Sequence, residues 1–272
     1  MKVGKSLAAG AARLAAGSET PRLDAELLMA HALGTSREEM LLRRLNDPAP
    51  AAFDPLLTRR EAGEPVAYIV GTRDFWTITL EVGPGVLIPR PDSETLIEAA
   101  VAHFGARSPG RVLDLGTGPG TLLLAALAQW PDAHGLGIDA SEAALAYARR
   151  NAERLALSDR AEFRRGDWAE GLAGPFDLIL CNPPYVETGA DLPRDVSEWE
   201  PREALFAGPD GLDDYRRLAP CLRPLLAPGG IACLEIGAGQ AAAVTALLAR
   251  QGLTVEARRD LGGIDRCLIA KG

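Results

Sequence analysis

The fold is decided by the stretch Asp114-Leu115-Gly116-Thr117-Gly118-Pro119-Gly120, which joins an apolar run, Arg111–Leu115, to a helical pattern, Thr121–Gln129. Its glycines let the backbone approach a ligand closely, and the N-terminus of the following helix presents unpaired N–H groups. The spacing Gly-x-Gly-x-Gly differs from the dinucleotide fingerprint, which places its third glycine where this chain has Thr121. A plain turn is the alternative interpretation of such a loop.

Asp139 supports the ligand-binding interpretation of this loop. It ends the next strand pattern, Gly135–Asp139, about twenty residues after the loop, where an acidic side chain can accept hydrogen bonds from both hydroxyls of a ribose. The alternative role is a helix N-cap, because a helical pattern begins at Glu142, but Ser141 can provide that cap instead. Loop and acid together predict an adenosine-type cofactor without separating NAD from S-adenosylmethionine.

Strand and helix patterns alternate from residue 94 to the C-terminus, as in an α/β sheet. The expected strands are Arg111–Leu115, Gly135–Asp139, Ala161–Arg165, Phe176–Cys181, Gly230–Ile236, Thr254–Arg258 and Arg266–Ala270. The expected helices are Glu94–Phe104, Thr121–Gln129, Glu142–Leu155, Asp213–Leu226 and Gln240–Gln251. This pattern predicts a doubly wound, seven-stranded Rossmann-like sheet within a domain of residues 92–272.

Residues 1–64 predict a small helical bundle, because their apolar residues recur at three- and four-residue spacing. The expected helices are Ser6–Ala16, Pro21–Leu33, Ser36–Arg44 and Phe53–Ala62. Thr20-Pro21 and the pair Ser36 and Glu39 are typical of helix starts, and Gly34 is typical of a helix end. The bundle is interpreted either as a partner-docking domain or as a solvated decoration without a role of its own.

Residues 65–91 predict a β-hairpin that connects the two domains. Phe75–Val82 is rich in β-formers that roughly alternate with polar residues, Gly83–Gly85 is typical of a turn, and Val86–Ile88 is the expected return strand.

Asn182-Pro183-Pro184-Tyr185 follows the strand pattern Phe176–Cys181, at the strand end where open α/β sheets bind ligands. The two prolines fix the backbone and remove N–H donors, so the carbonyls before them can face a ligand. Asn182 adds a side-chain acceptor and Tyr185 an aromatic face. Such a site can hold a planar –NH2 group by its hydrogens and aim its nitrogen at a methyl sulfonium, which favours S-adenosylmethionine. A polyproline-like turn is the alternative interpretation.

The composition excludes several classes of protein. Among 272 residues, 47% are hydrophobic and 24% charged, as in ordinary globular proteins, and no apolar run is long enough to cross a bilayer. Three His and four Cys are scattered, which predicts neither a metal site nor disulfides and favours a cytoplasmic protein. The net charge of −8 is a poor match to nonspecific binding of a phosphate backbone.

Taken together, the motifs resemble those of the release-factor glutamine methyltransferases, the family named PrmC or HemK, over nearly the whole chain. The matching stretches are Asp24–Leu28, Glu64–Gly71, Ile88–Glu98, Asp114–Gly120, Gly166–Trp168, Asn182–Tyr185, Glu200–Leu205 and Asp210–Arg216. Asn-Pro-Pro-Tyr alone is shared with enzymes that methylate amino groups of DNA and RNA, whereas the connector and the loop after the motif are more specific. One departure is Pro119, where the family commonly has Ser or Thr.

The resemblance implies S-adenosylmethionine as the cofactor, S-adenosylhomocysteine as its product, and no metal. The implied methyl acceptor is the side-chain amide nitrogen, N5, of the Gln in the Gly-Gly-Gln motif of class I peptide-chain release factors, which act in translation termination. The implied cofactor-binding residues are Gly116, Thr117, Gly118, Pro119, Gly120, Asp139, Trp168 and Asn182. The implied residues for binding and orienting the substrate amide are Asn182, Pro183, Pro184 and Tyr185. We expect a monomer that docks the release factor through residues 1–64, without nucleic acid or membrane partners.

Two other functions remain open at this stage. One is an amino-methyltransferase acting on adenine or cytosine in nucleic acid, against which the acidic charge and the lack of a basic recognition domain weigh. The other is a non-catalytic S-adenosylmethionine-binding adaptor, against which the intact motifs weigh. The alternative interpretation of Trp168 is a side chain of the hydrophobic core. No role is assigned to Arg90.

Overall fold

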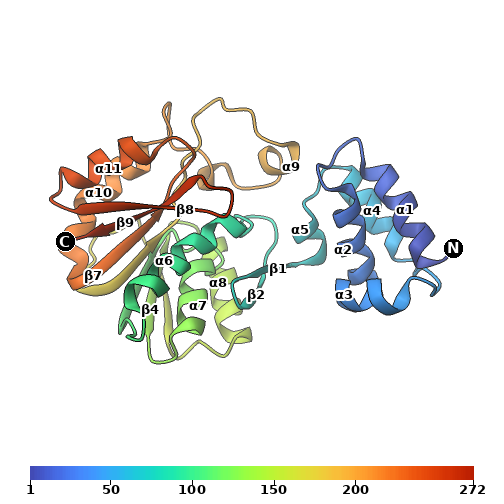
Figure 1. Ribbon diagram of the computed structural model, residues 1–272, viewed down its shortest axis with the longest axis horizontal. Helices are drawn as coiled ribbons and strands as arrows, with labels where there is room; N and C mark the ends of the chain where they lie inside the picture. The colour runs from blue at the N-terminus through green and yellow to red at the C-terminus, as the bar shows by residue number, and fades with distance from the viewer. The chain divides into compact units, whose positions relative to one another are not determined.

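The computed structural model describes all 272 residues, which form two compact units (Figure 1). The smaller unit comprises Met1–Thr72 and Leu192–Trp199, and the larger comprises Arg73–Asp191 and Glu200–Gly272. The smaller unit thus takes in residues 65–72 and 192–199, which the expected domain of residues 1–64 does not include. None of the helices combines the length and the apolar character that a membrane crossing requires.

Helices build the smaller unit, drawn in blue to cyan in Figure 1 apart from α9. They are α1 (Val3–Leu14), α2 (Pro21–Leu33), α3 (Arg37–Glu39), the π-helix η1 (Met40–Arg44), α4 (Phe53–Glu61), α5 (Val66–Val70) and α9 (Arg194–Ser197). Their shared core consists of buried apolar side chains that include Leu7, Leu28, Met29, Met40 and Phe53. Burial of these side chains stabilises the bundle, since isolated helices of this length are marginal in water.

The predicted helix ends are largely confirmed. Gly34 ends α2 in the left-handed conformation, with φ of 64°, and the Ser36 hydroxyl accepts a hydrogen bond from the Glu39 N–H at 3.1 Å. The expected single helix Ser36–Arg44 is wrong in detail, because α-helical hydrogen bonding gives way to π-helical bonding at Met40. Helix α5 was not expected, and it begins directly after Pro65.

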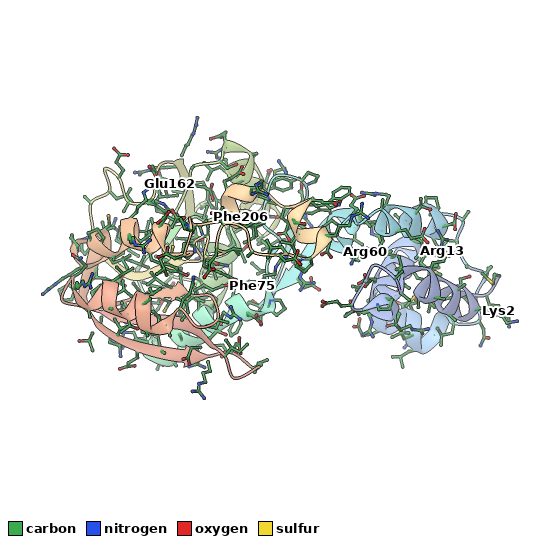
Figure 2. All side chains as sticks on the ribbon, turned by 90° about the horizontal axis from the view of Figure 1, so that it is seen from above. Lys2, Arg13, Arg60, Phe75, Glu162 and Phe206 are labelled. Carbon is green, nitrogen blue, oxygen red and sulfur yellow. The ribbon has the colours of Figure 1, made fainter.

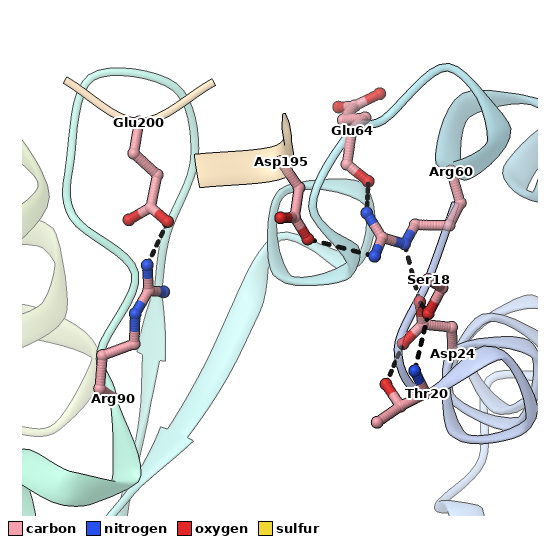
Figure 3. A network of polar contacts seen from close by, with 8 residues as sticks. All are labelled: Ser18, Thr20, Asp24, Arg60, Glu64, Arg90, Asp195 and Glu200. Atoms are coloured by element: carbon pink, nitrogen blue, oxygen red, sulfur yellow. Dashed lines mark hydrogen bonds and ion pairs between the residues drawn. The ribbon is translucent and has the colours of Figure 1, made fainter. Parts of the chain in front are cut away.

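A buried guanidinium ties the segment 192–199 to the helices of the smaller unit (Figures 2 and 3). Arg60 Nε donates to Asp24 Oδ2 at 2.7 Å, and Arg60 Nη2 donates to Asp195 Oδ2 at 3.1 Å. The side chains of Arg60 and Asp24 are only 7% and 8% exposed, so each charge depends on its partner. Asp195 lies in α9, and the ion pair therefore fixes this short helix against α4.

The two-stranded sheet exists, but its turn is not where the sequence predicted it. The strands are β1 (Thr72–Phe75) and β2 (Ile78–Glu81), with the turn at Trp76, whose φ is +54°. The Trp76 N–H donates to the Glu94 carboxylate at 2.8 Å, a bond that stabilises this uncommon backbone conformation. The expected return strand Val86–Ile88 is wrong, because its Ile88 N–H donates to a Glu200 carboxylate instead of a strand partner.

The larger unit is built on a seven-stranded sheet with the order β5-β4-β3-β6-β7-β9-β8 (Figure 1). The strands are β3 (Arg111–Leu115), β4 (His134–Asp139), β5 (Ala161–Arg165), β6 (Phe176–Cys181), β7 (Leu226–Glu235), β8 (Thr254–Arg259) and β9 (Asp265–Lys271). All neighbours are parallel except β9, which runs antiparallel to β7 and β8. The predicted doubly wound Rossmann-like sheet is confirmed.

Helices cover this sheet. They are α6 (Glu94–Phe104), α7 (Thr121–Gln129), α8 (Glu142–Arg154), α10 (Asp213–Leu225) and α11 (Ala241–Ala249), with short 3-10 turns η2 (Pro91–Ser93) and η3 (Arg202–Ala204). The central strands are buried on both faces, which explains their nearly continuous apolar sequences.

The strand order reverses between β3 and β6, which are adjacent in the sheet although β4 and β5 separate them in sequence. Leu115, the last residue of β3, pairs with Cys181, the last residue of β6. The loops that follow these two strands are therefore neighbours at the carboxyl edge of the sheet. In open α/β sheets this position is the ligand-binding crevice.

Candidate active site

The glycine loop between β3 and α7 is a strained turn that only glycine adopts readily. Gly116, Gly118 and Gly120 have φ values of 72°, 56° and 87°. The N–H groups of Gly116 and Thr117 both donate to the Ile138 carbonyl at 2.9 Å, which ties the loop to the end of β4. These backbone hydrogen bonds and left-handed glycines define the shape of the loop.

Asp139, the last residue of β4, holds the other side of this loop. Its Oδ2 accepts the Gly118 N–H at 2.8 Å, and its Oδ1 accepts the Ser141 N–H at 2.8 Å. The cap of α8 is Ser141, whose hydroxyl accepts the Ala144 N–H at 3.2 Å, so Asp139 is not the N-cap. Burial raises the pKa of Asp139, while the backbone N–H donors lower it.

Asp114 is a site residue that the sequence analysis did not single out. It is 1% exposed, and its Oδ2 accepts hydrogen bonds from the Thr117 hydroxyl at 2.7 Å and from the Leu123 N–H at 3.1 Å. Its Oδ1 has no hydrogen-bond partner. Burial raises the pKa of Asp114 to about 7. A lone acid inside the apolar strand sequence Val112–Leu115 is the pattern that points to it.

Trp168 forms a wall of the site. Its backbone is left-handed, with φ of 49°, and its indole Nε1 donates to Asp214 Oδ1 at 3.1 Å. A Cβ at Gly116 would lie 3.1 Å from the Trp168 ring, so glycine at 116 is what permits this close packing. Trp168 packs against the core of the sheet but is only half-buried, and its remaining surface lines a cavity.

The Asn-Pro-Pro-Tyr motif directly follows β6. The Asn182 Nδ2 donates to the Ser93 hydroxyl at 3.1 Å. Pro183 is buried and Pro184 is half-buried. The Tyr185 hydroxyl is turned toward the sheet, where it donates to Glu235 Oε1 at 3.3 Å. Burial raises the pKa of Tyr185, which therefore stays protonated at neutral pH.

Arg90 forms an ion pair with Glu200 (Figure 3). Its guanidinium donates to one carboxylate oxygen of Glu200, and the other oxygen accepts the Ile88 N–H at 2.9 Å. The Glu200 side chain is only 1% exposed. The segment that precedes α6 is thus fastened to the loop that follows Asn182.

One cavity of about 460 Å³ in the larger unit collects most of the candidate residues. This volume lies in the range of small-molecule sites. Its lining includes eight of the sequence-predicted residues, namely Gly116, Thr117, Gly118, Pro119, Asp139, Trp168, Asn182 and Pro184. Of the other three, Gly120 is the N-cap residue before α7, Pro183 is buried and the Tyr185 hydroxyl donates to Glu235. Asp114, Arg90 and Ser93 line the cavity as well.

Two family descriptions match the chain, PrmC N-terminal domain over residues 5–71 and methyltransferase domain over residues 107–224. Among solved structures, the Thermus thermophilus 16S rRNA N2 G1207 methyltransferase in complex with AdoMet and guanosine is 23% identical, with a TM-score of 0.54. That likeness covers 74% of this chain and 49% of the other, and it shows the fold alone.

Closer relatives are named release factor glutamine methyltransferase. The protein from Rhodospirillum rubrum is 48% identical over 99% of this chain and 85% of its own length. The protein from Caulobacter vibrioides is 44% identical over 93% of this chain and 90% of its own length. With such identity along both units, the chain belongs to the family of release factor glutamine methyltransferases.

Proposed function

We propose that this chain transfers a methyl group from S-adenosylmethionine to the side-chain amide nitrogen of the Gln in the Gly-Gly-Gln motif of class I peptide-chain release factors. The observation that carries the proposal is that Asn182 and Pro184 line the same cavity as the glycine loop and Asp139. A motif suited to a planar amide thus lies beside a loop suited to a nucleoside. The names of the relatives from R. rubrum and C. vibrioides agree with this activity.

The residues around the cavity fit S-adenosylmethionine, which combines adenine and ribose with a positively charged amino-acid portion. Asp139 would bind the ribose hydroxyls and Trp168 would lie beside the adenine. Asp114, whose Oδ1 has no partner, would pair with the cationic portion. A Cβ at Gly118 would meet no atom within 4 Å, so the loop leaves room beside its backbone. When bound, the cofactor supplies an electrophilic methyl group on its sulfonium.

Asn182 and Pro183 would act on the substrate amide. An amide nitrogen is a poor nucleophile, because its lone pair is delocalised into the carbonyl. Acceptance of its two hydrogens by the Asn182 side-chain oxygen and the Pro183 carbonyl would increase electron density on nitrogen and fix its direction. Positioning of this kind lowers a reaction barrier by roughly 7–11 kcal/mol at best. One amide proton leaves to water, so no dedicated base is required.

The helical unit would dock the release factor, while the larger unit performs the transfer. Its three buried acids, Asp24, Glu26 and Glu64, and its one buried arginine, Arg60, all form ion pairs within the unit, which leaves the outer surface of the helices for a protein partner. The net charge of −8 argues against nonspecific binding of nucleic acid. We also propose that the chain works as a monomer in the cytoplasm, where release factors act.

The test is methylation of an unmodified release factor by the purified protein and S-adenosylmethionine, with the product mapped by peptide mass spectrometry. A single methyl on the Gln of Gly-Gly-Gln is expected. Asn182→Ala should unfold at the same temperature as the wild type and lose methyl transfer. If the Gln stays unmodified while the cofactor binds, the proposal is wrong, and DNA and RNA become the next substrates to assay.

A separate experiment tests whether the helical unit docks the release factor. The intact release factor should be methylated with a higher kcat/KM than a short peptide that contains Gly-Gly-Gln, because only the intact factor can contact the helical unit. Equal kcat/KM values for the two substrates would contradict a docking role.

A further inference from the structure

Asn151 is a fully buried polar side chain to which the proposed chemistry assigns no role. It lies on α8 and is 0% exposed. Its Oδ1 accepts the Glu81 N–H at 2.6 Å, and its Nδ2 donates to the Glu81 carbonyl at 3.0 Å and to the Pro119 carbonyl at 2.9 Å. One side-chain amide therefore binds the last residue of β2 and the glycine loop at the same time.

The chain that follows β2 packs on the same face of α8. Residues 81–89 form this segment, the strap. Tyr147 and Asn151 are four residues apart on α8 and therefore lie on one face of the helix. A Cβ at Gly83 would collide with the Tyr147 hydroxyl, so the backbone of the strap passes directly over this side chain.

The strap is also part of the cavity wall. Four of its residues line the cavity, namely Gly85, Val86, Leu87 and Pro89. Its far end is fastened by Glu200, which accepts the Ile88 N–H at 2.9 Å and pairs with Arg90. Shortly after Arg90, the Ser93 hydroxyl accepts the Asn182 Nδ2–H at 3.1 Å. The strap thus connects the glycine loop, where the cofactor would bind, to the motif that would bind the amide.

We infer that Asn151 is a positioning residue that fixes the strap against the glycine loop and thereby shapes the cofactor end of the cavity. Without its hydrogen bonds, the Glu81 end of the strap would move relative to Pro119, while Glu200 still held the other end. The cofactor would then have to order the strap as it binds, and fixing a single residue of backbone costs about tenfold in an equilibrium constant. This inference rests on the proposed function, because it takes S-adenosylmethionine as the ligand of the cavity.

The first experiment titrates the full chain with S-adenosylmethionine by calorimetry. Asn151→Ala and Asn151→Asp both lose the donors to the Glu81 and Pro119 carbonyls, so the Kd should rise at least about tenfold. Glu81→Gln is the matched control, because it removes the ion pairs with Arg150 and Arg154 but keeps the backbone groups that Asn151 binds. Its Kd should stay within about threefold of the wild type.

Hydrogen exchange of the cofactor-free protein supplies a readout that depends on neither binding nor activity. The amides of residues 82–88 should exchange at least about tenfold faster in Asn151→Ala than in the wild type. Leu145→Ala, at another fully buried position of α8, separates positioning from general stability. It should lower Tm, because it leaves a cavity in the core, and should keep both the exchange of the strap and the Kd within about threefold of the wild type.

A second set of variants moves the strap without changing Asn151. Gly83→Ala places a methyl group against the Tyr147 hydroxyl, so the strap is displaced and the Kd for S-adenosylmethionine should rise at least about tenfold. Tyr147→Phe removes the colliding oxygen. The double variant, Gly83→Ala with Tyr147→Phe, should therefore return the Kd to within about threefold of the wild type.

The outcomes separate this inference from the proposed function. A folded Asn151→Ala with the wild-type Kd would overturn the inference, and so would an equal rise of the Kd in Leu145→Ala. If the Asn151 variants do not fold, a wild-type Kd in Gly83→Ala would overturn it, whereas a raised Kd that the double variant restores would support it. None of these titrations contains a release factor. A wild type that binds the cofactor but leaves the Gln unmodified would therefore overturn the proposed function alone, and one that binds no cofactor would overturn both.

Discussion

Replacing Asp114 by Asn should stabilise the cofactor-free protein near neutral pH and, at the same time, weaken cofactor binding. Asp114 is buried, and both of its hydrogen bonds, from Thr117 and Leu123, end on the single oxygen Oδ2. The side-chain oxygen of Asn can accept the same two bonds. The other oxygen has no partner, so the new amide group breaks no hydrogen bond. The substitution therefore removes a buried charge, and it leaves a buried N–H2 group without an acceptor, which costs about 1–3 kcal/mol.

The magnitude follows from the pKa of this carboxyl, which burial raises from 3.8 to about 7. A carboxyl whose pKa is higher in the folded state favours folding below its unfolded pKa, and this contribution is lost as pH rises through the folded pKa. A pKa difference of about 3 corresponds to roughly 4 kcal/mol. After the cost of the buried N–H2 group is subtracted, the net gain at about pH 8 is about 1–3 kcal/mol. At about 2–4 °C per kcal/mol for a chain of this size, Asp114→Asn should therefore raise Tm by several degrees at about pH 8. At about pH 5 the contribution of the pKa difference falls to roughly 2 kcal/mol, so Asp114→Asn and the wild type should unfold at nearly the same temperature.

The assay is thermal unfolding of wild type and Asp114→Asn without cofactor at both pH values. Calorimetric titration with S-adenosylmethionine supplies the second arm. Because a cationic ligand favours the ionised carboxyl, the wild-type Kd should rise about tenfold for each pH unit below about 7 and level off above it. Asp114→Asn should bind more weakly, with a Kd that does not follow this pH dependence. An unchanged or lower Tm for Asp114→Asn at about pH 8 would refute the reasoning.

Three further substitutions test the helical unit and the glycine loop. Arg60→Met should destabilise the protein by about 3–5 kcal/mol in urea unfolding, because it leaves Asp24 buried without its cation. Asp195→Asn changes a partner of Arg60 whose side chain is 33% exposed, so it should lower the free energy of unfolding by less than about 1 kcal/mol. If Arg60→Met and Asp195→Asn destabilised the protein equally, burial of the Arg60–Asp24 pair would not explain the loss. Gly116→Ala should raise the Kd for S-adenosylmethionine at least about tenfold, because the left-handed backbone is strained and the new methyl displaces Trp168. An unchanged Kd in titration would show that the close packing at Gly116 is dispensable.

Much of the fold could be predicted because local sequence and tertiary structure agree there. Helix α2 begins at Pro21 and ends at Leu33 as expected, since a proline and a left-handed glycine define its two ends. Strands β3 and β6 also match residue for residue, because strands buried on both faces read as apolar runs. The glycine loop and the Asn-Pro-Pro-Tyr motif follow these strands, so their adjacency follows from the strand order.

The small two-stranded sheet could not be placed correctly, because the group that decides its turn is distant in sequence. A left-handed residue in a turn is usually glycine or asparagine, and Gly83–Gly85 is the local sequence that fits. The chain instead turns at Trp76, whose N–H is held by the carboxylate of Glu94 on α6. A sequence pattern that spans only a few residues cannot include this contact, because Trp76 and Glu94 are 18 residues apart.

The residues missed at the site share one physical property: they are polar groups buried inside otherwise apolar or helix-starting sequence. Asp114 stands within Val112–Leu115, and Glu235 stands between Leu234 and Ile236. Sequence patterns identify such residues as exceptions without naming their partners. The structure supplies the partners, and for Glu235 the partner is the hydroxyl of Tyr185 in the Asn-Pro-Pro-Tyr motif.

The choice between a docking domain and a solvated decoration can be narrowed by the path of the chain. A decoration needs one linker, whereas this chain leaves the larger unit a second time, at residue 192, and returns at residue 200. The inserted segment is held in the helical unit by the hydrogen bond from the buried Arg60 to Asp195. In sequence this segment lies between Asn182 and Glu200, and Glu200 in turn binds Arg90. A protein that docked on the helical unit, as we propose, would therefore contact a unit that includes a segment continuous with the Asn-Pro-Pro-Tyr motif. This second crossing of the chain gives the helical unit a covalent connection to the proposed active site that a solvated decoration would not require.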